Sequence, residues 1–225
     1  MKPENKLFAT LDTAVRAGKL PKGTQALFVD TVGFVSDLPT SLVAAFKSTL
    51  DDIRQADVLI HVTDASDPDR LDQHAAVMEV LAQLDLPEEL LRQRICVHNK
   101  VDLLSPAQRA AGATVEVEMV GASHSQRRQA EALWLESPAM DVSVTRGDNL
   151  GELRTRIEAA VMAVKGVTEL TLRVGHDRPD VVQFAYKHGT VVKHTVTDDG
   201  TNTVLTVLLP QPMLGKLKAL KDARE

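Results

Sequence analysis

One segment, Val58-Leu-Ile-His-Val-Thr63, is nearly continuous in β-branched and apolar residues. A run of this kind is typical of a strand that is covered on both faces, as in a parallel sheet. A turn over residues 64–69 and a helix over residues 71–84 are predicted after it, and a second apolar strand is predicted over Ile95–His98. The segment therefore indicates a sheet of parallel strands joined by helices.

The same alternation continues on both sides of this segment. Toward the N-terminus, Gln25–Val29 is predicted as a strand that ends at Asp30, and Pro39-Thr-Ser41 offers the cap of a following helix. Toward the C-terminus, a helix over residues 126–135, a strand over 141–144 and a helix over 149–164 are expected. Strands and helices in this order predict a doubly wound α/β sheet, whose ligands bind at the carboxyl ends of the strands.

A second pattern begins after Lys165-Gly166. It predicts a strand over 168–174, a helix over 178–188, strands over 190–196 and 202–209, and a terminal helix. The turn residues Asp198-Asp-Gly200 between the last two strands indicate a hairpin. We therefore expect two domains, one over residues 1–166 and a small α+β domain over residues 167–225.

Composition narrows the classes of partner. The 225 residues carry a formal net charge of −5, which repels nucleic acid on average, so no DNA partner is expected and any RNA contact must be local. The single cysteine excludes an intrachain disulfide, and no apolar run approaches the ~18 residues of a membrane span. Neither a hydrophobic signal core nor an Arg-rich presequence opens the sequence, and the choice between cytoplasm and mitochondrion stays open.

The first candidate motif is Asp30-Thr-Val-Gly33, at the end of a predicted strand. Asp30 could hold a Mg²⁺-bound water, and the amide of Gly33 could donate to a terminal phosphate, because glycine has no side chain to block the approach. An ordinary turn would have the same residues, so the motif alone is weak.

The second candidate motif, Asn99-Lys-Val-Asp102, follows the strand predicted over Ile95–His98. The carboxylate of Asp102 could accept hydrogen bonds from N1–H and the 2-amino group of guanine, a pair of donors that adenine lacks. Lys100 would lay its methylene stem on the base, and Asn99 would bond the base edge or a neighbouring loop. The tetrapeptide is also compatible with a helix start.

The third candidate motif is Ser143-Val-Thr145, at the next predicted strand end. It would supply a backbone N–H for the guanine carbonyl.

Four segments together resemble the HflX-type GTPases, a branch of the translational GTPases that act on ribosomes. They are Leu7-Phe-Ala-Thr-Leu-Asp12, Phe28-Val-Asp-Thr-Val-Gly-Phe-Val-Ser-Asp-Leu-Pro39, Leu42-Val-Ala-Ala-Phe46 and Asp57-Val-Leu-Ile-His-Val-Thr-Asp64. The resemblance covers residues 7–165 in detail and the C-terminal part more loosely. It implies a P-loop-NTPase-like sheet, a GTP or GDP ligand with Mg²⁺, and the large ribosomal subunit as a partner.

The resemblance also assigns the site residues. Thr10 would be the switch threonine that ligates Mg²⁺ and contacts the γ-phosphate, and Asp30 would be the second residue at the metal. The nucleotide would be contacted by Phe8, Ala9, Thr10, Leu11, Asp12, Asp30, Thr31, Val32, Gly33, Asn99, Lys100, Val101, Asp102, Ser143, Val144 and Thr145. Phe34 stands where many GTPases carry a water-orienting glutamine, so hydrolysis is expected to be slow or assisted by a partner, and no catalytic residue is assigned.

One family feature is missing from these 225 residues, the phosphate loop G-x-x-x-x-G-K-[ST]. In the family this loop, with the first strand and helix of the sheet, lies just before the position of Leu7. Losing about four charge-assisted bonds at ~1.5–3 kcal/mol each would cost on the order of 6–12 kcal/mol of binding. We therefore expect a truncated GTPase domain with weak nucleotide binding and no hydrolysis by this chain alone. The alternative is a non-catalytic module that binds a ribosome or a protein.

Overall fold

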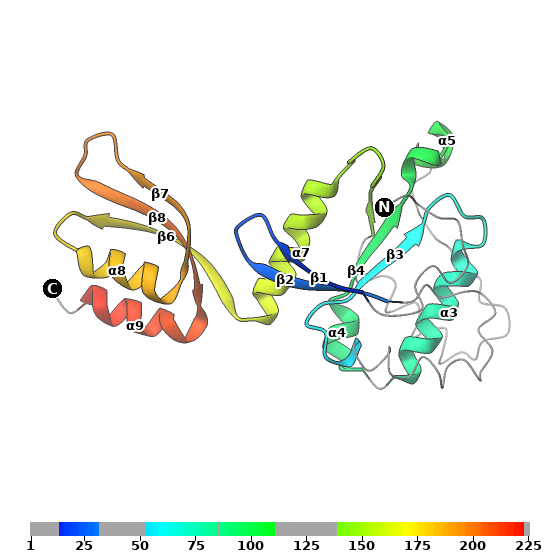
Figure 1. The fold of residues 1–225 in the computed structure, drawn as a ribbon, viewed down its shortest axis with the longest axis horizontal. Helices are drawn as coiled ribbons and strands as arrows, with labels where there is room; N and C mark the ends of the chain where they lie inside the picture. The colour runs from blue at the N-terminus through cyan, green and yellow to red at the C-terminus, as the bar shows by residue number, and fades with distance from the viewer. Residues whose placement is uncertain (1–13, 32–52, 85, 111–138, 223–225) are drawn as a thin grey trace. The chain divides into compact units, whose positions relative to one another are not determined.

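The computed structural model describes residues 14–31, 53–84, 86–110 and 139–222 (Figure 1). The chain divides into two compact units, one of residues 1–18 and 26–154 and the other of residues 19–25 and 155–225. This division falls inside helix α7 (Leu150–Val164), whereas the predicted domain boundary at residue 166 lies just after it. That boundary stays a prediction.

A parallel sheet organises the first unit. Its strands are β3 (Ile60–Asp64), β4 (Ile95–Asn99) and β5 (Met140–Asp141), hydrogen-bonded in that order. In the register, Asp64 at the end of β3 lies beside Asn99 at the end of β4. The structure confirms the predicted α/β class, and it brings the carboxyl ends of the strands to one edge.

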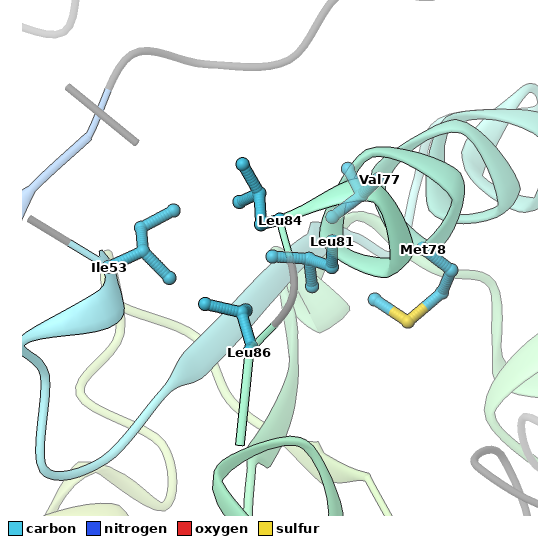
Figure 2. Packing of buried hydrophobic residues seen from close by; sticks show 6 residues of the cluster. All are labelled: Ile53, Val77, Met78, Leu81, Leu84 and Leu86. Carbon is cyan, nitrogen blue, oxygen red and sulfur yellow. The ribbon is translucent and has the colours of Figure 1, made fainter. Parts of the chain in front are cut away.

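The core of this unit lies between the sheet and helix α3 (Arg70–Gln83), close to the predicted helix over 71–84. Figure 2 shows Ile53, Leu81, Leu84 and Leu86 converging beside that helix. All are less than a tenth exposed, and burial of each leucine or isoleucine contributes ~1.5–3 kcal/mol. Two short helices, α4 (Glu88–Arg92) and α5 (Pro106–Ala110), were not predicted from the sequence.

A second, two-stranded sheet is not hydrogen-bonded to the parallel sheet in the described residues. It consists of β1 (Ala14–Lys19), which was not predicted, and β2 (Gln25–Asp30), which was. Gly23 in the connecting turn has φ of 95°, a left-handed conformation that favours glycine. Among the described residues, β3 is an edge strand of the parallel sheet and is not paired with β2.

The second unit contains an antiparallel sheet whose strands run in the order β6 (Val167–Gly175), β8 (Asn202–Pro210) and β7 (Thr190–Val196). Helices α8 (Pro179–His188) and α9 (Gln211–Asp222) complete it. The predicted hairpin is confirmed, with Gly200 at φ of 66° in the turn and the amide of Thr197 donating to the carbonyl of Asn202 at 2.9 Å.

In the second unit, alternate residues of β8 are the most deeply buried, and Leu208 on the opposite face of the strand is also buried, at 4% exposure. Leu205, Val207 and Leu209 of β8 are at most 1% exposed. Leu209 clusters with Leu217 of α9, and Leu205 and Val207 cluster with Ala185 of α8. Alternate residues of the central strand therefore pack under the two helices.

Two predicted features differ from the structure or fall outside it. The strand predicted over 141–144 is shorter and earlier, because residues 143–148 turn back on themselves through Gly147 at φ of 83°. The helices expected after Pro39 and over 126–135 lie outside the described residues. No helix among the described residues combines the length and apolar character that crossing a bilayer requires.

A pair of histidines lies between β3 and α3 in the first unit. The rings of His61 and His74 have centroids 4.6 Å apart, and His74 is 4% exposed. Burial, reinforced by the charge of Arg94, lowers the pKa of His61 to about 4. Burial, with contributions from His61 and Arg94, lowers the pKa of His74 to about 3. Both rings are therefore neutral in the folded protein at neutral pH.

The chain is expected to lose stability in mild acid. In the unfolded chain these histidines take up protons below their ordinary pKa of 6.5, whereas the folded protein resists protonation until about pH 4 or lower. At 1.36 kcal/mol per pH unit, acidification to about pH 5 lowers the free energy of unfolding by at most about 2 kcal/mol per histidine. Urea unfolding at neutral and acidic pH measures the loss.

A matched pair of variants assigns this dependence. Replacement of the buried ring in His74→Leu should reduce the pH dependence, and Thr195→Ala, an exposed position with no ionisable group, should leave it unchanged. Equal pH dependence in the wild type and His74→Leu would contradict the assignment.

Candidate functional site

The loop after β3 is the first of three loops that make up the candidate site. Asp64 accepts hydrogen bonds at its Oδ1 from the backbone N–H and the hydroxyl of Ser66, at 2.9 and 2.6 Å. The backbone N–H of Ala65 donates to the carbonyl of Asn99 at 2.8 Å. These bonds tie the loop after β3 to the loop after β4.

The loop after β4 contains the predicted residues Asn99–Asp102. Lys100 has φ of 65°, so the chain turns sharply before the short helical turn η1 (Val101–Leu103). The Lys100 ammonium pairs with Oδ2 of Asp64 at 2.6 Å. The backbone N–H of Val101, which is buried, donates to the carbonyl of Val142 at 3.3 Å. This loop is therefore attached to both of its neighbours.

The loop after β5 contains the predicted residues Ser143–Thr145. The hydroxyl of Ser143, which is fully buried, donates to Oδ1 of Asp102 at 2.6 Å. It also accepts a hydrogen bond from the backbone N–H of Arg146 at 3.1 Å. The backbone N–H of Val144 donates to Oδ1 of Asn99 at 3.2 Å. Two side chains of the second motif are thus bonded to the third.

Charge at the site is set by these contacts. The hydrogen bond from Ser143 holds the pKa of Asp102 below its ordinary value, and the charges of Arg146 and Arg109 act in the same direction. Partial burial raises the pKa of Asp64, but hydrogen bonds from Lys100 and Ser66 outweigh it and lower the pKa overall. Both carboxyl groups are therefore ionised at neutral pH, and each accepts hydrogen bonds without donating one.

The remaining predicted residues are not brought to these loops by the described structure. Asp30 is exposed at the end of β2, and the described residues give its side chain no hydrogen bond or ion pair with the three loops. Thr31 follows it. Seven predicted residues lie outside the described ranges: Phe8, Ala9, Thr10, Leu11, Asp12, Val32 and Gly33.

The structure also contains site residues that were not predicted. Asp64 pairs with Lys100, and Asn149 holds the end of β5 through its Nδ2, which donates to the carbonyl of Asp141 at 2.8 Å. The sequence did contain a signal for Asp64, because Asp64 is a polar residue at the end of one strand just as Asn99 is at the end of the next. Asn149 has φ of 58° and gives no comparable signal in the sequence. Among the described residues, no group of three or more His, Cys, Asp or Glu could hold a metal ion.

Comparisons with known proteins identify relatives of this chain. A family model described as 50S ribosome-binding GTPase matches residues 1–100. The chain is 36% identical over 220 residues to GTP-binding protein 6 of Mus musculus, which covers 98% of this chain and 38% of the relative. It is 35% identical over 214 residues to GTPase HflX of Akkermansia muciniphila, which covers 95% of this chain and 44% of that protein.

A third relative, GTPase HflX of Lacrimispora saccharolytica, is 31% identical over 220 residues, or 98% of this chain and 45% of that protein. The chain therefore spans about two fifths of the length of the curated relatives that it matches.

Removal of the Ser143 hydroxyl tests the central contact of the site. In Ser143→Ala the Asp102 carboxylate loses its shortest hydrogen bond, so its pKa should rise toward the ordinary value of 3.8. The carboxyl ¹³C shift of Asp102, followed by NMR during an acid titration, measures this change. Thr145→Ala, an exposed position of the same loop, should leave the Asp102 titration unchanged. An unshifted titration in Ser143→Ala would show that the hydroxyl does not control this carboxylate.

Proposed function

Because the chain belongs to the HflX-type GTPase family, we propose that the loops after β3, β4 and β5 form the guanine-binding half of its nucleotide site. The observation that supports this most directly is the 2.6 Å hydrogen bond between Ser143 and Asp102, which joins the two motifs expected to contact the base. We propose that Asn99, Lys100, Asp102 and Ser143–Thr145 bind the base, with Asp102 selecting guanine.

The selection follows from hydrogen-bond chemistry. Each carboxylate oxygen has two acceptor positions, so the bond from Ser143 leaves Asp102 able to accept the N1–H and the 2-amino group of guanine. Adenine presents a bare N1 acceptor at the same place, which would face the ionised carboxylate without a proton between them. A site that is built to bond a donor discriminates against the analogue that lacks it, because the acceptor positions facing that donor are then left unpaired.

The pairing of Lys100 with Asp64 supports the same proposal. With its ammonium held at 2.6 Å from the Asp64 carboxylate, the side chain of Lys100 is restrained at its charged end. An aliphatic stem in a fixed position can cover one face of a planar base while the charge stays at the rim. Asp64 would then act on the base through Lys100.

The phosphate side of the site rests on fewer residues. We propose that Asp30 approaches Mg²⁺ and the phosphates, together with Thr10 and the amide of Gly33. The exposed carboxylate of Asp30 fits this role, since Mg²⁺ is commonly bound by one or two carboxylates together with substrate phosphates. When bound, Mg²⁺ supplies positive charge that neutralises the phosphates. Because these 225 residues contain no G-x-x-x-x-G-K-[ST], we propose that this chain alone binds GTP weakly and does not hydrolyse it.

Guanine selectivity can be measured directly on the 225-residue chain. In a ¹H–¹⁵N NMR titration with millimolar GMP, we expect shifts of the amides of Asn99–Asp102 and Val144–Arg146, and no comparable shifts with AMP. GTP should bind little more tightly than GMP, because the phosphates meet few donors in this chain.

Two variants serve as controls for this titration. Asp102→Ala should abolish the GMP shifts, and Glu152→Ala, an exposed acidic position on α7, should leave them unchanged. Equal response to GMP and AMP would contradict the guanine proposal, and micromolar GTP affinity would contradict the proposed weakness of the phosphate side.

We further propose that the large ribosomal subunit is the partner. Support comes from the matching family model, which is described as a 50S ribosome-binding GTPase. We expect the chain to co-sediment with large subunits when guanine nucleotide and Mg²⁺ are supplied at millimolar concentration, and less without them. Asp102→Ala should lose this nucleotide dependence.

The other outcomes of the sedimentation experiment are equally informative. Equal co-sedimentation with and without nucleotide would favour a non-catalytic interaction module. Failure to co-sediment under both conditions would contradict the ribosome proposal.

A further inference from the structure

A single side chain closes the loop that carries the third motif. Asn149 lies just before helix α7, and its Nδ2 donates to the backbone carbonyl of Asp141 at 2.8 Å. Asp141 is the last residue of β5. The bond therefore joins the two ends of the segment 142–148, which contains Ser143–Thr145 and is called the base loop below.

The carbonyl of Asp141 is one that the sheet does not pair. Val142, the next residue, donates its N–H to the carbonyl of His98 on β4 at 2.8 Å. The C=O and N–H of one trans peptide group point in opposite directions, so the Asp141 carbonyl points away from β4. In the described part of the sheet, β5 is an edge strand without a neighbour on that side. The amide of Asn149 therefore supplies the donor that a neighbouring strand would otherwise provide.

The backbone at position 149 restricts which residue can make this bond. Its φ of 58° lies in the left-handed region, which glycine and asparagine adopt more readily than most residues. Its carbonyl accepts a hydrogen bond from the amide of Leu153 at 2.9 Å and so begins α7. Glycine would allow the conformation without a donor, and an ionised aspartate would face the carbonyl with an acceptor. Asparagine supplies both the conformation and the donor.

The base loop is also hydrogen-bonded within itself. The amide of Ser143 donates to the carbonyl of Asp148 at 3.2 Å, and the amide of Gly147 donates to the carbonyl of Ser143 at 2.8 Å. Because Asp148 directly precedes Asn149, the side-chain bond of Asn149 continues this pairing of the two arms down to the end of β5.

Hydrogen bonds, and not packing, hold this loop against the second motif. Residues 144–149 are all exposed, so apolar burial contributes little to their placement. The hydroxyl of the buried Ser143 nevertheless donates to Asp102 at 2.6 Å, and the amide of Val144 donates to Oδ1 of Asn99 at 3.2 Å. Hydrogen bonds weaken steeply when their alignment is lost, so both contacts require a fixed backbone in the base loop.

We propose that Asn149 is a positioning residue, which closes the base loop and thereby holds the Ser143 hydroxyl and the Val144 amide against the Asn99–Asp102 motif. The functional part of this proposal rests on the function proposed above, in which these loops bind guanine. Asn149 is assigned no contact with the base and acts through the backbone of the base loop. All of these residues lie in the first compact unit.

Amide hydrogen exchange tests the closure of the loop. Asn149→Gly keeps the left-handed conformation and loses the donor, so exchange at Ser143 and Gly147 should accelerate by about three- to tenfold. Asn149→Asp should accelerate exchange at least as much, because its carboxylate repels the Asp141 carbonyl. Glu152→Ala, exposed on α7, should leave both amides unchanged.

The two variants at position 149 share the loss of the donor but differ in chain flexibility. Acceleration in both therefore assigns the effect to the side-chain bond. Wild-type exchange in either folded variant would overturn the closure, and one folded variant is enough to decide the result.

The positioning role has a separate readout at Asp102. A loosened base loop should weaken the bond from Ser143, so the pKa of Asp102 in Asn149→Gly should rise toward its ordinary value of 3.8. The carboxyl ¹³C shift of Asp102 during an acid titration measures this change. A merely structural contact would move the unfolding midpoint and leave this titration as it is in the wild type. An unchanged Asp102 titration beside accelerated exchange would overturn the positioning role.

The response to nucleotide is measured separately, with the GMP titration described above. If the wild-type chain responds, Asn149→Gly should need about three- to tenfold more GMP for half of the shift at Asn99–Asp102. Equal concentrations would overturn the functional part of the proposal. If the wild-type chain does not respond, the guanine proposal fails, and the exchange and Asp102 measurements still decide whether Asn149 places the loop.

Discussion

The hydrogen bond from the Ser143 hydroxyl to the Asp102 carboxylate is the contact on which the candidate site depends. It can form because β4 and β5 are parallel neighbours, so the loops that follow them leave the sheet at the same edge. The backbone strengthens the junction, since the amide of Val142 donates to the carbonyl of His98 at 2.8 Å. Full burial of Ser143 removes competing water and gives its hydroxyl a fixed acceptor.

The electrostatics of the site are set by short contacts and not by the net charge of the chain. A net charge of −5 favours no anionic ligand over long distances, so recognition has to come from short contacts. Asp102 and Asp64 are both kept ionised, by Ser143 and by Lys100 with Ser66. Their acceptor oxygens suit the donor edge of a purine, whereas phosphates need donors. Within the described residues, the base side of the proposed site is consequently the better formed one.

The sequence predicted the elements whose hydrophobic pattern is strong. The apolar runs at β3 and β4, the period of α3 and the Asp-Asp-Gly turn between β7 and β8 all gave elements that the structure confirms. β1 was not predicted because Ala14-Val-Arg-Ala-Gly-Lys19 contains two charged residues, a glycine and no apolar run, and in the structure it is held by its pairing with β2. The motif residues Asn99, Asp102 and Ser143 were found because each lies at or just after the end of a strand. The hydrogen bonds from the backbone N–H of Lys22 to the Glu158 carboxylate could not be found in this way, since these residues are 136 positions apart in the sequence.

The central claim, that Asp102 binds the base and selects guanine, is tested most directly by replacing its carboxylate with an amide. In Asp102→Asn the side chain gains an amide donor, which would repel the 2-amino group of guanine and bond the 2-carbonyl of xanthine in its place. The account predicts that NMR titration of this variant shows a preference for XMP over GMP, the reverse of the wild-type chain. The same order of preference in both proteins would contradict the assignment of Asp102 to the base.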